Sequence, residues 1–133
     1  MSVTHRQSRC WSREGQASLT YDKDFTAESD VGLSVAVADA TADEEHLLAI
    51  DVSQLKSLFI ASDQDVTIET NNPGGASAAA DDVLDLKADQ PLIWAEDDEW
   101  ACPLTVDVTK LWITNASGST ANVELRALID STP

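Results

Sequence analysis

Alternation of apolar and polar residues with a period of two is the feature that most constrains how this chain can fold. Side chains two positions apart lie on the same face of a β-strand, so each alternating stretch predicts a strand with one face on a core and the other in water. The alternating apolar sets are Val31, Leu33, Val35 and Val37; Leu48, Ile50 and Val52; Val66 and Ile68; Leu104, Val106 and Val108; and Val123, Leu125, Ala127 and Ile129.

Two further segments, Ser57–Ala61 and Leu111–Thr114, are apolar on both faces, which is typical of central or covered strands. The polar stretch Ser62–Asp65 lies between two apolar runs and predicts a tight hairpin. About eight or nine strands with frequent turns predict an all-β fold, a β-sandwich or jelly roll. Further breaks lie at Asn71–Gly75, at Ala88–Pro91 and at Asn115–Ser119, which links the last two strands.

The chain of 133 residues has the length of one ordinary domain. Residues 1–16 are polar and lack periodicity, so we expect an extended basic N-terminal arm there. Residues 17–133 are expected to form a single β-sandwich domain. The stretch Ala40–Glu45 is the one candidate helix, and Ala76–Ala80, which is low in complexity, predicts a loop.

One internal similarity connects the two halves of the domain. Asp51–Leu55 resembles Asp107–Leu111, and each copy is followed by an aromatic–isoleucine step and then by a turn and a strand. Two similar hairpins, one in each half of a sandwich, would produce this pattern, and so would a chance resemblance between two β-hairpins.

The charge is strongly negative and unevenly distributed. The chain has 24 Asp and Glu against 8 Lys and Arg, a net charge of −16, yet residues 1–13 carry three arginines and no acid. An acidic body repels nucleic acid and anionic lipid, so neither is an expected partner. The composition resembles that of proteins from marine or hypersaline organisms, and an ordinary acidic, soluble surface is the alternative.

Membrane insertion and secretion find no support in the sequence. No run approaches the roughly 18 apolar residues of a membrane span, and the N-terminus lacks the apolar segment of a secretory signal. We therefore expect synthesis and folding without a membrane step, unless a signal has already been removed.

Groups that carry chemistry are scattered. The acidic run Glu96–Glu99 could bind Ca²⁺, but it lacks the glycine and carbonyl ligands of an ordered loop, so a solvated surface is favoured. His5 and His46 have no nucleophile in a motif, and Cys10 and Cys102 fit no zinc spacing, so two free thiols are favoured over a disulfide. We predict no catalytic, cofactor-binding or metal-ligating residue and no enzyme.

Shorter acidic clusters lie at Asp22/Asp24, Asp63/Asp65 and Asp81/Asp82/Asp85. The tripeptide Asn115-Ala116-Ser117 is a glycosylation sequon in a turn predicted to be exposed.

Two features point to binding. Trp94, Trp100 and Trp112 could form a sugar-stacking platform, although buried aromatics or an intersubunit contact are expected more often of tryptophans on strands. The basic arm from Ser2 to Arg13 could lie across a neighbouring acidic subunit, guided by charge, and the alternative is a frayed terminus without a role.

The residue pattern of four segments is similar to that of a known class of proteins. The segments are Ser57–Asn71, Lys87–Trp94, Leu111–Gly118 and Val123–Leu128. They resemble small virion proteins of tailed viruses of bacteria and archaea, encoded among head genes. The similarity is one of pattern across most of the β body, and it does not extend to the arm.

That resemblance implies a non-enzymatic structural role in a virion. We expect a capsid decoration or cementing protein, made in the host cytoplasm, that binds the major capsid protein and copies of itself, with a trimer as the expected oligomer. A tail, neck or baseplate component is a second hypothesis, and a carbohydrate-binding β-sandwich module is a third.

Overall fold

The computed structural model describes residues 2–71 and 80–131 of the chain. Within these ranges it contains ten strands, one short 3₁₀-helix and no α-helix, so the all-β prediction is confirmed. The elements are β1 (Val3–Trp11), β2 (Leu19–Ala27), β3 (Ser29–Val37), β4 (Thr41–Ile50), η1 (Val52–Gln54), β5 (Leu55–Ser62), β6 (Val66–Thr70), β7 (Val83–Leu86), β8 (Leu92–Ala95), β9 (Val108–Asn115) and β10 (Ala121–Ile129).

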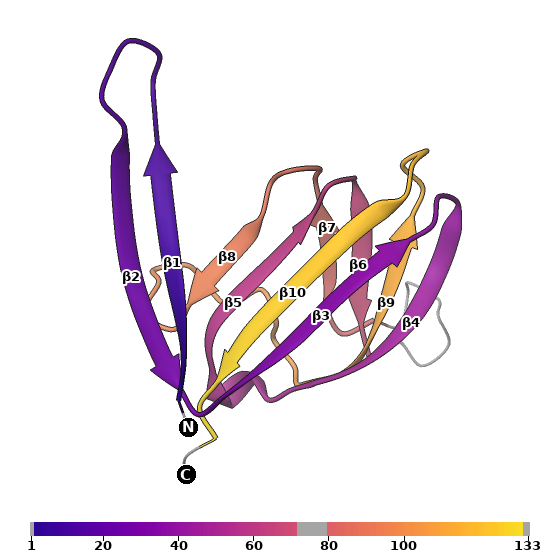
Figure 1. Ribbon diagram of the computed structural model, residues 1–133. Helices are drawn as coiled ribbons and strands as arrows, with labels where there is room; N and C mark the ends of the chain where they lie inside the picture. The colour runs from indigo at the N-terminus through magenta and orange to yellow at the C-terminus, as the bar shows by residue number, and fades with distance from the viewer. Residues whose placement is uncertain (1, 72–79, 132–133) are drawn as a thin grey trace.

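Eight of the strands form two antiparallel sheets that pack face to face, which confirms the predicted β-sandwich (Figure 1). The strand orders are β3-β10-β5-β8 in one sheet and β4-β9-β6-β7 in the other. From β3 to β10 the chain crosses from one sheet to the other at every connection except that between β6 and β7. Most sequence neighbours therefore lie in opposite sheets, and β6 and β7 are the pair of sequence neighbours within these two sheets that are hydrogen-bonded to each other.

The alternating apolar sets meet between the two sheets. Leu58 and Ile60 on β5 and Ile68 on β6 are fully buried there, as the pattern predicts. Burying each such side chain stabilises the fold by roughly 1.5–3 kcal/mol relative to leaving it in water. The other large side chains buried in this core include Ile50, Leu111, Ile113, Leu125, Val37, Val108 and Val123.

The helix expected at Ala40–Glu45 is wrong, because Ala40 lies in a turn and the rest of the stretch is the start of β4. Thr41 pairs with Asn115 and Glu44 pairs with Ile113 on β9, with a bulge between them. Ala40 and Asp43 adopt positive φ angles of 61° and 52°, which an α-helix does not allow. A stretch of six residues is too short to hold a helix by itself, so pairing with a central strand determines its conformation.

The hairpin expected at Ser62–Asp65 is also wrong. The stretch is a short turn, but β5 before it and β6 after it belong to different sheets. Likewise, the expected strand at Leu104–Val108 begins only at Val108, although Leu104 is buried in the core.

The internal similarity now has a structural counterpart. The two copies lead into β5 and β6 and into β9 and β10, which are the four central strands, two in each sheet. The carboxylate of Asp107 in the second copy accepts a hydrogen bond of 2.9 Å from the backbone of Val52 in the first. The copies therefore occupy equivalent positions in the sandwich and contact each other, although neither is a hairpin.

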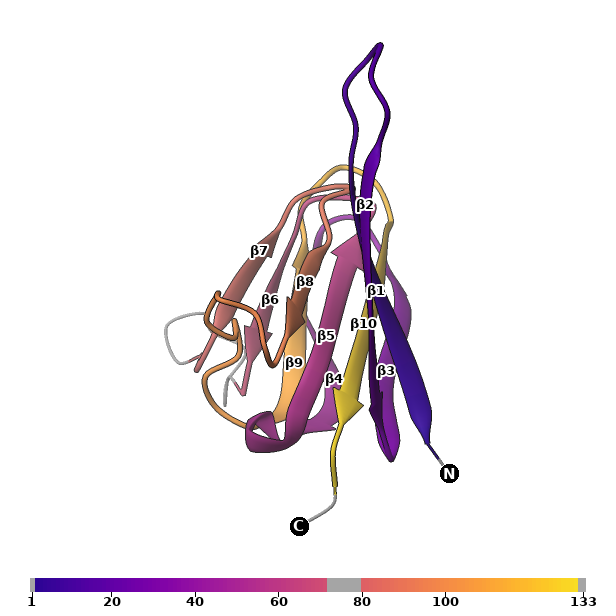
Figure 2. The same cartoon turned by 90° about the vertical axis from the view of Figure 1, so that its left-hand side faces the viewer.

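The N-terminal segment is one half of a long hairpin. β1 pairs with β2 along nine consecutive residue pairs, from Val3 opposite Ala27 to Trp11 opposite Leu19. The boundary drawn at residue 16 falls in the turn between these strands, where Gly15 has a φ of +78° that favours glycine. Figure 2 shows that this hairpin crosses the outer face of the β3-β10-β5-β8 sheet and extends beyond the sandwich.

A second, smaller cluster of buried side chains joins the base of the hairpin to the sheet. Leu128 lies on the outer face of β10 and is fully buried, together with Ala95, beneath Phe25 and Ala27 of β2. Val3 of β1 packs against the same group. The hairpin base is therefore part of the folded body.

No helix in the described ranges has the length and apolar character needed to cross a membrane.

A pair of substitutions on β10 separates the two cores. Leu125→Ala in the main core should lower the free energy of unfolding by about 2–5 kcal/mol and speed amide exchange in every strand. Leu128→Ala should speed exchange chiefly in β1 and β2, because it opens the cluster beneath the hairpin. Hydrogen exchange measured by mass spectrometry checks this, and unchanged exchange in β1 and β2 of Leu128→Ala would contradict the described docking.

Candidate docking surface

The β1–β2 hairpin has one face turned toward the sandwich and one turned away from it. The inward positions of β1 are the odd-numbered residues from Val3 to Trp11, and their cross-strand partners on β2 are the odd-numbered residues from Leu19 to Ala27. The even-numbered residues form the outward face, where Arg6 pairs with Asp24 through two hydrogen bonds of 2.7 and 3.1 Å. The hydrogen bond from Arg6 lowers the pKa of Asp24 below its ordinary value.

The lower half of the inward face is tied to the sheet beneath it. The side-chain amide of Gln7 donates to the hydroxyl of Ser57 at 3.1 Å and to the carbonyl of Trp94 at 2.7 Å. The ring of His5 lies 3.6 Å from the carboxylate of Asp30 on β3. These contacts join β1 to β3, β5 and β8 at once, so they fix the direction of the hairpin.

The acidic run Glu96–Glu99 lies beside the middle of the hairpin. Arg9 donates to Asp98 at 2.9 Å, and Lys23 forms an ion pair with Asp97. Asp98 also accepts a hydrogen bond of 3.0 Å from the backbone of Ala95, which holds its carboxylate in place. These carboxylates therefore serve as partners for the hairpin's cations.

The upper half of the inward face extends past the sandwich, and its large side chains are exposed. Trp11 and Leu19 stand opposite each other, and Tyr21 stands opposite Arg9. Their exposed fractions are 58% for Trp11, 50% for Leu19 and 69% for Tyr21. We call these three side chains the distal patch. The apolar face of the hairpin thus runs on past the body that covers its base.

The distal patch was missed by sequence analysis, although a signal for it was present. Leu19, Tyr21, Phe25 and Ala27 occupy alternate positions of one strand, interrupted by Lys23. On β1 the inward positions include the polar residues His5, Gln7 and Arg9, so the sequence of this strand shows no apolar alternation.

Charge separates the hairpin from the body. Residues 1–28 contain four Lys and Arg and four Asp and Glu, so they are neutral in sum. Residues 29–133 contain four basic and 20 acidic residues and carry the whole net charge of −16. The distal patch therefore lies on a hairpin without net charge, which projects from a strongly acidic body.

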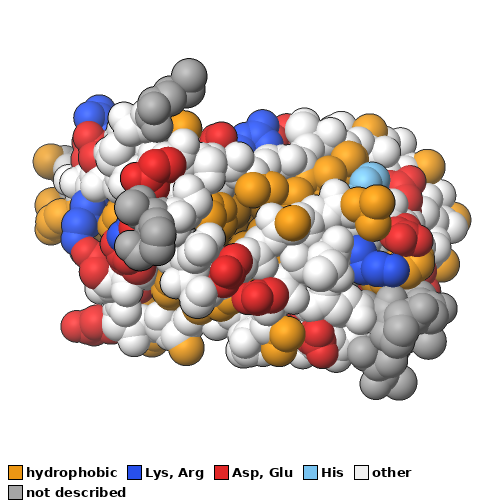
Figure 3. All heavy atoms as spheres, turned by 90° about the horizontal axis from the view of Figure 1, so that it is seen from below, with side chains coloured by type: hydrophobic (Ala, Val, Ile, Leu, Met, Phe, Trp, Pro, Cys, Tyr) orange, Lys and Arg blue, Asp and Glu red, His pale blue; other side chains and the backbone are white. Residues whose placement is uncertain are grey.

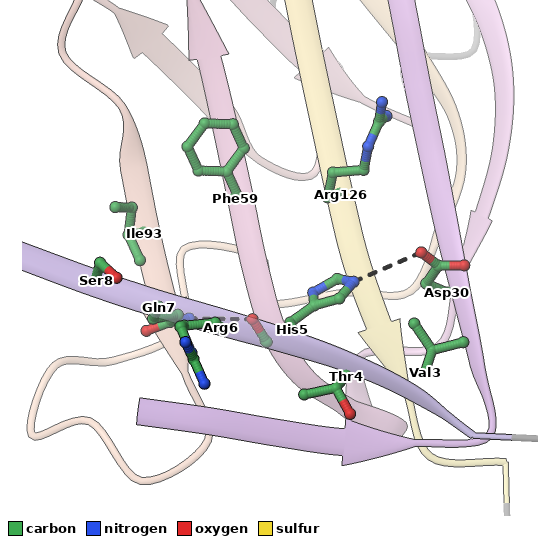
Figure 4. Close-up of a pocket in the computed structure, with 11 residues that line it drawn as sticks. Val3, Thr4, His5, Arg6, Gln7, Ser8, Asp30, Phe59, Ile93 and Arg126 are labelled. Carbon is green, nitrogen blue, oxygen red and sulfur yellow. Dashed lines mark hydrogen bonds and ion pairs between the residues drawn. The ribbon is translucent and has the colours of Figure 1, made fainter. Parts of the chain in front are cut away.

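A groove of about 570 Å³ lies where the hairpin crosses the sheet obliquely (Figure 4). His5 and Arg6 of β1 line one wall, and Phe59 and Arg126 line the floor on β5 and β10. Arg126 lies over Gly32, and a Cβ atom at residue 32 would come within 2.8 Å of the Arg126 guanidinium nitrogen. The groove is a consequence of the crossing angle, and its cations are already paired: Arg6 with Asp24 and Arg126 with Glu124 at 2.9 Å.

The three tryptophans singled out by sequence do not share a surface. Trp94 packs against the main core, with its indole N–H donating to the carbonyl of Trp100 at 2.9 Å. Trp112 alternates with the buried Leu111 and Ile113 and so lies on the outer face of the other sheet. Trp100 is exposed in the loop after β8. The structure therefore brings together no sugar-stacking platform from these residues.

The turn predicted to expose the sequon at Asn115 buries that side chain. Asn115 is fully buried, and its amide donates to the carbonyls of Val37, Ala38 and Ser119 at 2.8–3.3 Å. A side chain that holds the crossing between β9 and β10 in this way is closed to glycosylation.

The remaining candidate groups make local contacts. His46 lies 2.8 Å from Glu44 on the same strand. Cys10 and Cys102 are free thiols, and burial raises the pKa of Cys102 above its ordinary value. The described residues contain no group of three or more His, Cys, Asp or Glu placed to hold a metal ion. The shorter acidic clusters accept hydrogen bonds from neighbours: Asp63 from Asn122, Asp65 from Ala88, Asp81 from Asn71, Asp82 from Thr105 and Asp85 from Thr67.

Comparison with known proteins found no match: no family model, no curated protein and no solved structure is similar to this chain.

Removing one carboxylate tests how the hairpin is held. Asp98→Asn should speed amide exchange in β1 about two- to fivefold, because it breaks a partly exposed ion pair with Arg9. The effect should shrink in 1 M NaCl, which screens the pair. Glu99→Gln is the control, since it removes the same charge from the same loop without removing an ion pair to the hairpin. Equal effects of the two substitutions would show that Asp98 has no specific role.

Proposed function

We propose that this chain is a non-enzymatic structural protein of a tailed-virus particle, a capsid decoration or cementing protein. It binds the major capsid protein and copies of itself, and it is made in the host cytoplasm and resides in the virion. The observation that carries the proposal is the distal patch on a hairpin whose base is fixed to the body.

The composition of the patch supports attachment to a protein. Trp and Tyr are among the residues most enriched at the centres of protein interfaces, and Trp11 and Tyr21 lie on the same face of this hairpin. Large apolar side chains that remain exposed side by side mark interaction surfaces. Because the hairpin base is anchored, little further ordering would oppose binding, which favours affinity.

The strand order supports a jelly roll as the finer description of the sandwich. Two four-stranded sheets, with the chain crossing between them at every connection from β3 to β10 except that between β6 and β7, follow the pattern of eight-stranded jelly rolls. Viral capsid proteins and lectins both use this architecture, so the architecture alone does not choose between them. We choose a virion protein over a lectin because of the distal patch on the hairpin.

The charge distribution fits a protein that is packed at high copy number in salt. Neighbouring bodies of net −16 repel one another, so contacts are expected through the neutral hairpin and in screened solution. A tail, neck or baseplate component would use the same patch and would differ in copy number.

Copy number in purified particles tests the proposal directly. Quantitative mass spectrometry of virus particles purified from the organism that encodes this chain should find it at a level comparable to the major capsid protein. A few copies per particle would favour a tail or neck role instead. Absence from every particle fraction would overturn the virion assignment.

Substitutions in the distal patch test the attachment surface. Trp11→Ser combined with Tyr21→Ser should weaken rebinding to particles stripped of the chain by at least about tenfold, as expected for anchor residues. The matched control is Trp100→Ser, which removes a tryptophan that is 75% exposed outside the hairpin. Pelleting of the bound chain with particles gives the measurement, and unchanged rebinding of the double variant would exclude the patch as the attachment site.

A further inference from the structure

The four outer strands of the sandwich differ in how well their free edges are protected. β7 and β8 have four residues each, which leaves little edge to pair with. β4 is long, but its register is interrupted by two bulges, and it carries Asp43, Glu44 and Glu45. β3 has neither protection: its nine residues pair with β10 without interruption, and Asp30 is its only charged residue.

The side chains of β3 leave this edge open and apolar. Val31, Leu33 and Val35 face the core but are only half-buried, because no strand lies beyond them in the described structure. The outward positions hold small residues, Gly32 and Ser34 among them. β3 and β4 form the lower side of the sandwich in Figure 1, and Figure 3, which views that side, shows hydrophobic side chains in a band across it.

We propose that β3 pairs with β3 of a second copy of this chain, antiparallel, about a two-fold axis at Leu33. The two β3-β10-β5-β8 sheets then form one continuous sheet of eight strands. This inference names the surface for the self-association included in the proposed function. Because it uses a surface distinct from the distal patch, each of the two ideas can fail alone.

The register of this pairing is self-complementary. With the axis at Leu33, Leu33 faces its own copy, and Val31 faces Val35 of the second copy, so apolar side chains meet on the core side. Asp30 faces Ala36, so the two Asp30 carboxylates stand six positions apart along the strands. At about 3.4 Å per residue this separation is roughly 20 Å, about twice the screening length in 0.1 M salt. An isologous contact requires this kind of self-match.

We choose a second copy as the partner because two β3 edges present the same apolar, small and uncharged side chains to each other. A strand from an unrelated partner would need the same small, uncharged outward face, and the chain's own hairpin carries cations and large side chains on its strands. Opposing the contact is the repulsion between two bodies of net −16, so the dimer should strengthen with salt.

The mass of the full-length chain in solution tests the pairing. Light scattering at tens of micromolar in 2 M NaCl should give twice 14.3 kDa, with partial dissociation in low salt. A mass of 14.3 kDa at every salt concentration would overturn the proposal. A trimer, the oligomer expected from the sequence, would overturn it as well, because one two-fold edge accepts one partner.

Charge exchange tests the register. Ala36→Glu places a carboxylate opposite Asp30 of the second copy at two equivalent positions, and it should weaken the dimer about tenfold. Ala36→Lys should instead strengthen the dimer, since a cation then faces Asp30 of the second copy. Ala42→Glu on the β4 edge is the control for net charge alone.

Circular dichroism of each variant confirms that the fold is intact. Equal weakening by Ala36→Glu and Ala42→Glu, or no strengthening by Ala36→Lys, would refute pairing through β3 in this register.

Discussion

Leu128 lies on the face of β10 that looks away from the main core, and it is nonetheless fully buried. Phe25, Ala27 and Val3 at the base of the hairpin cover it. The arrangement of the rest of the hairpin follows from this small cluster, because it sets where the two strands cross the sheet. From that crossing the hairpin continues past the sandwich, and the upper part of its inward face is exposed as the distal patch.

Electrostatics acts on this structure at two ranges. At short range, Arg9 and Lys23 find their partners in Asp98 and Asp97, and these pairs hold the middle of the hairpin against the body. At long range, the net charge of the body opposes every contact between copies. A neutral projecting element and a long edge strand with a single charge are two places where that opposition is weak, and our proposals use them.

The predictions from sequence succeeded where one strand carries its own pattern. Alternation located β3 and β10, and the doubly apolar runs located β5 and β9 as central strands. It failed where the outcome depends on distant residues. The stretch from Ala40 to Glu45 became a bulged strand because β9 lies beside it. The turn after Ser62 leads into the opposite sheet, which no local residue reveals.

The docking of the hairpin was beyond sequence reasoning for a related reason. Arg9 and Asp98 are 89 positions apart, and Lys23 and Asp97 are 74 apart. An acidic run read alone resembles a solvated surface, and a basic segment read alone resembles an arm. The ion pairs between the acidic run and the hairpin are visible only in the folded structure. They form because the cluster around Leu128 places the hairpin beside that run.

The central claim is that the distal patch is an interface covered in the assembled particle. Hydroxyl-radical footprinting of Trp11 and Tyr21, in the free chain and in the intact particle, addresses it most directly. Our account predicts that both side chains are oxidised readily in the free chain and are protected in the particle, while Trp100 remains reactive in both. Equal oxidation of Trp11 and Tyr21 in the two states would contradict the account.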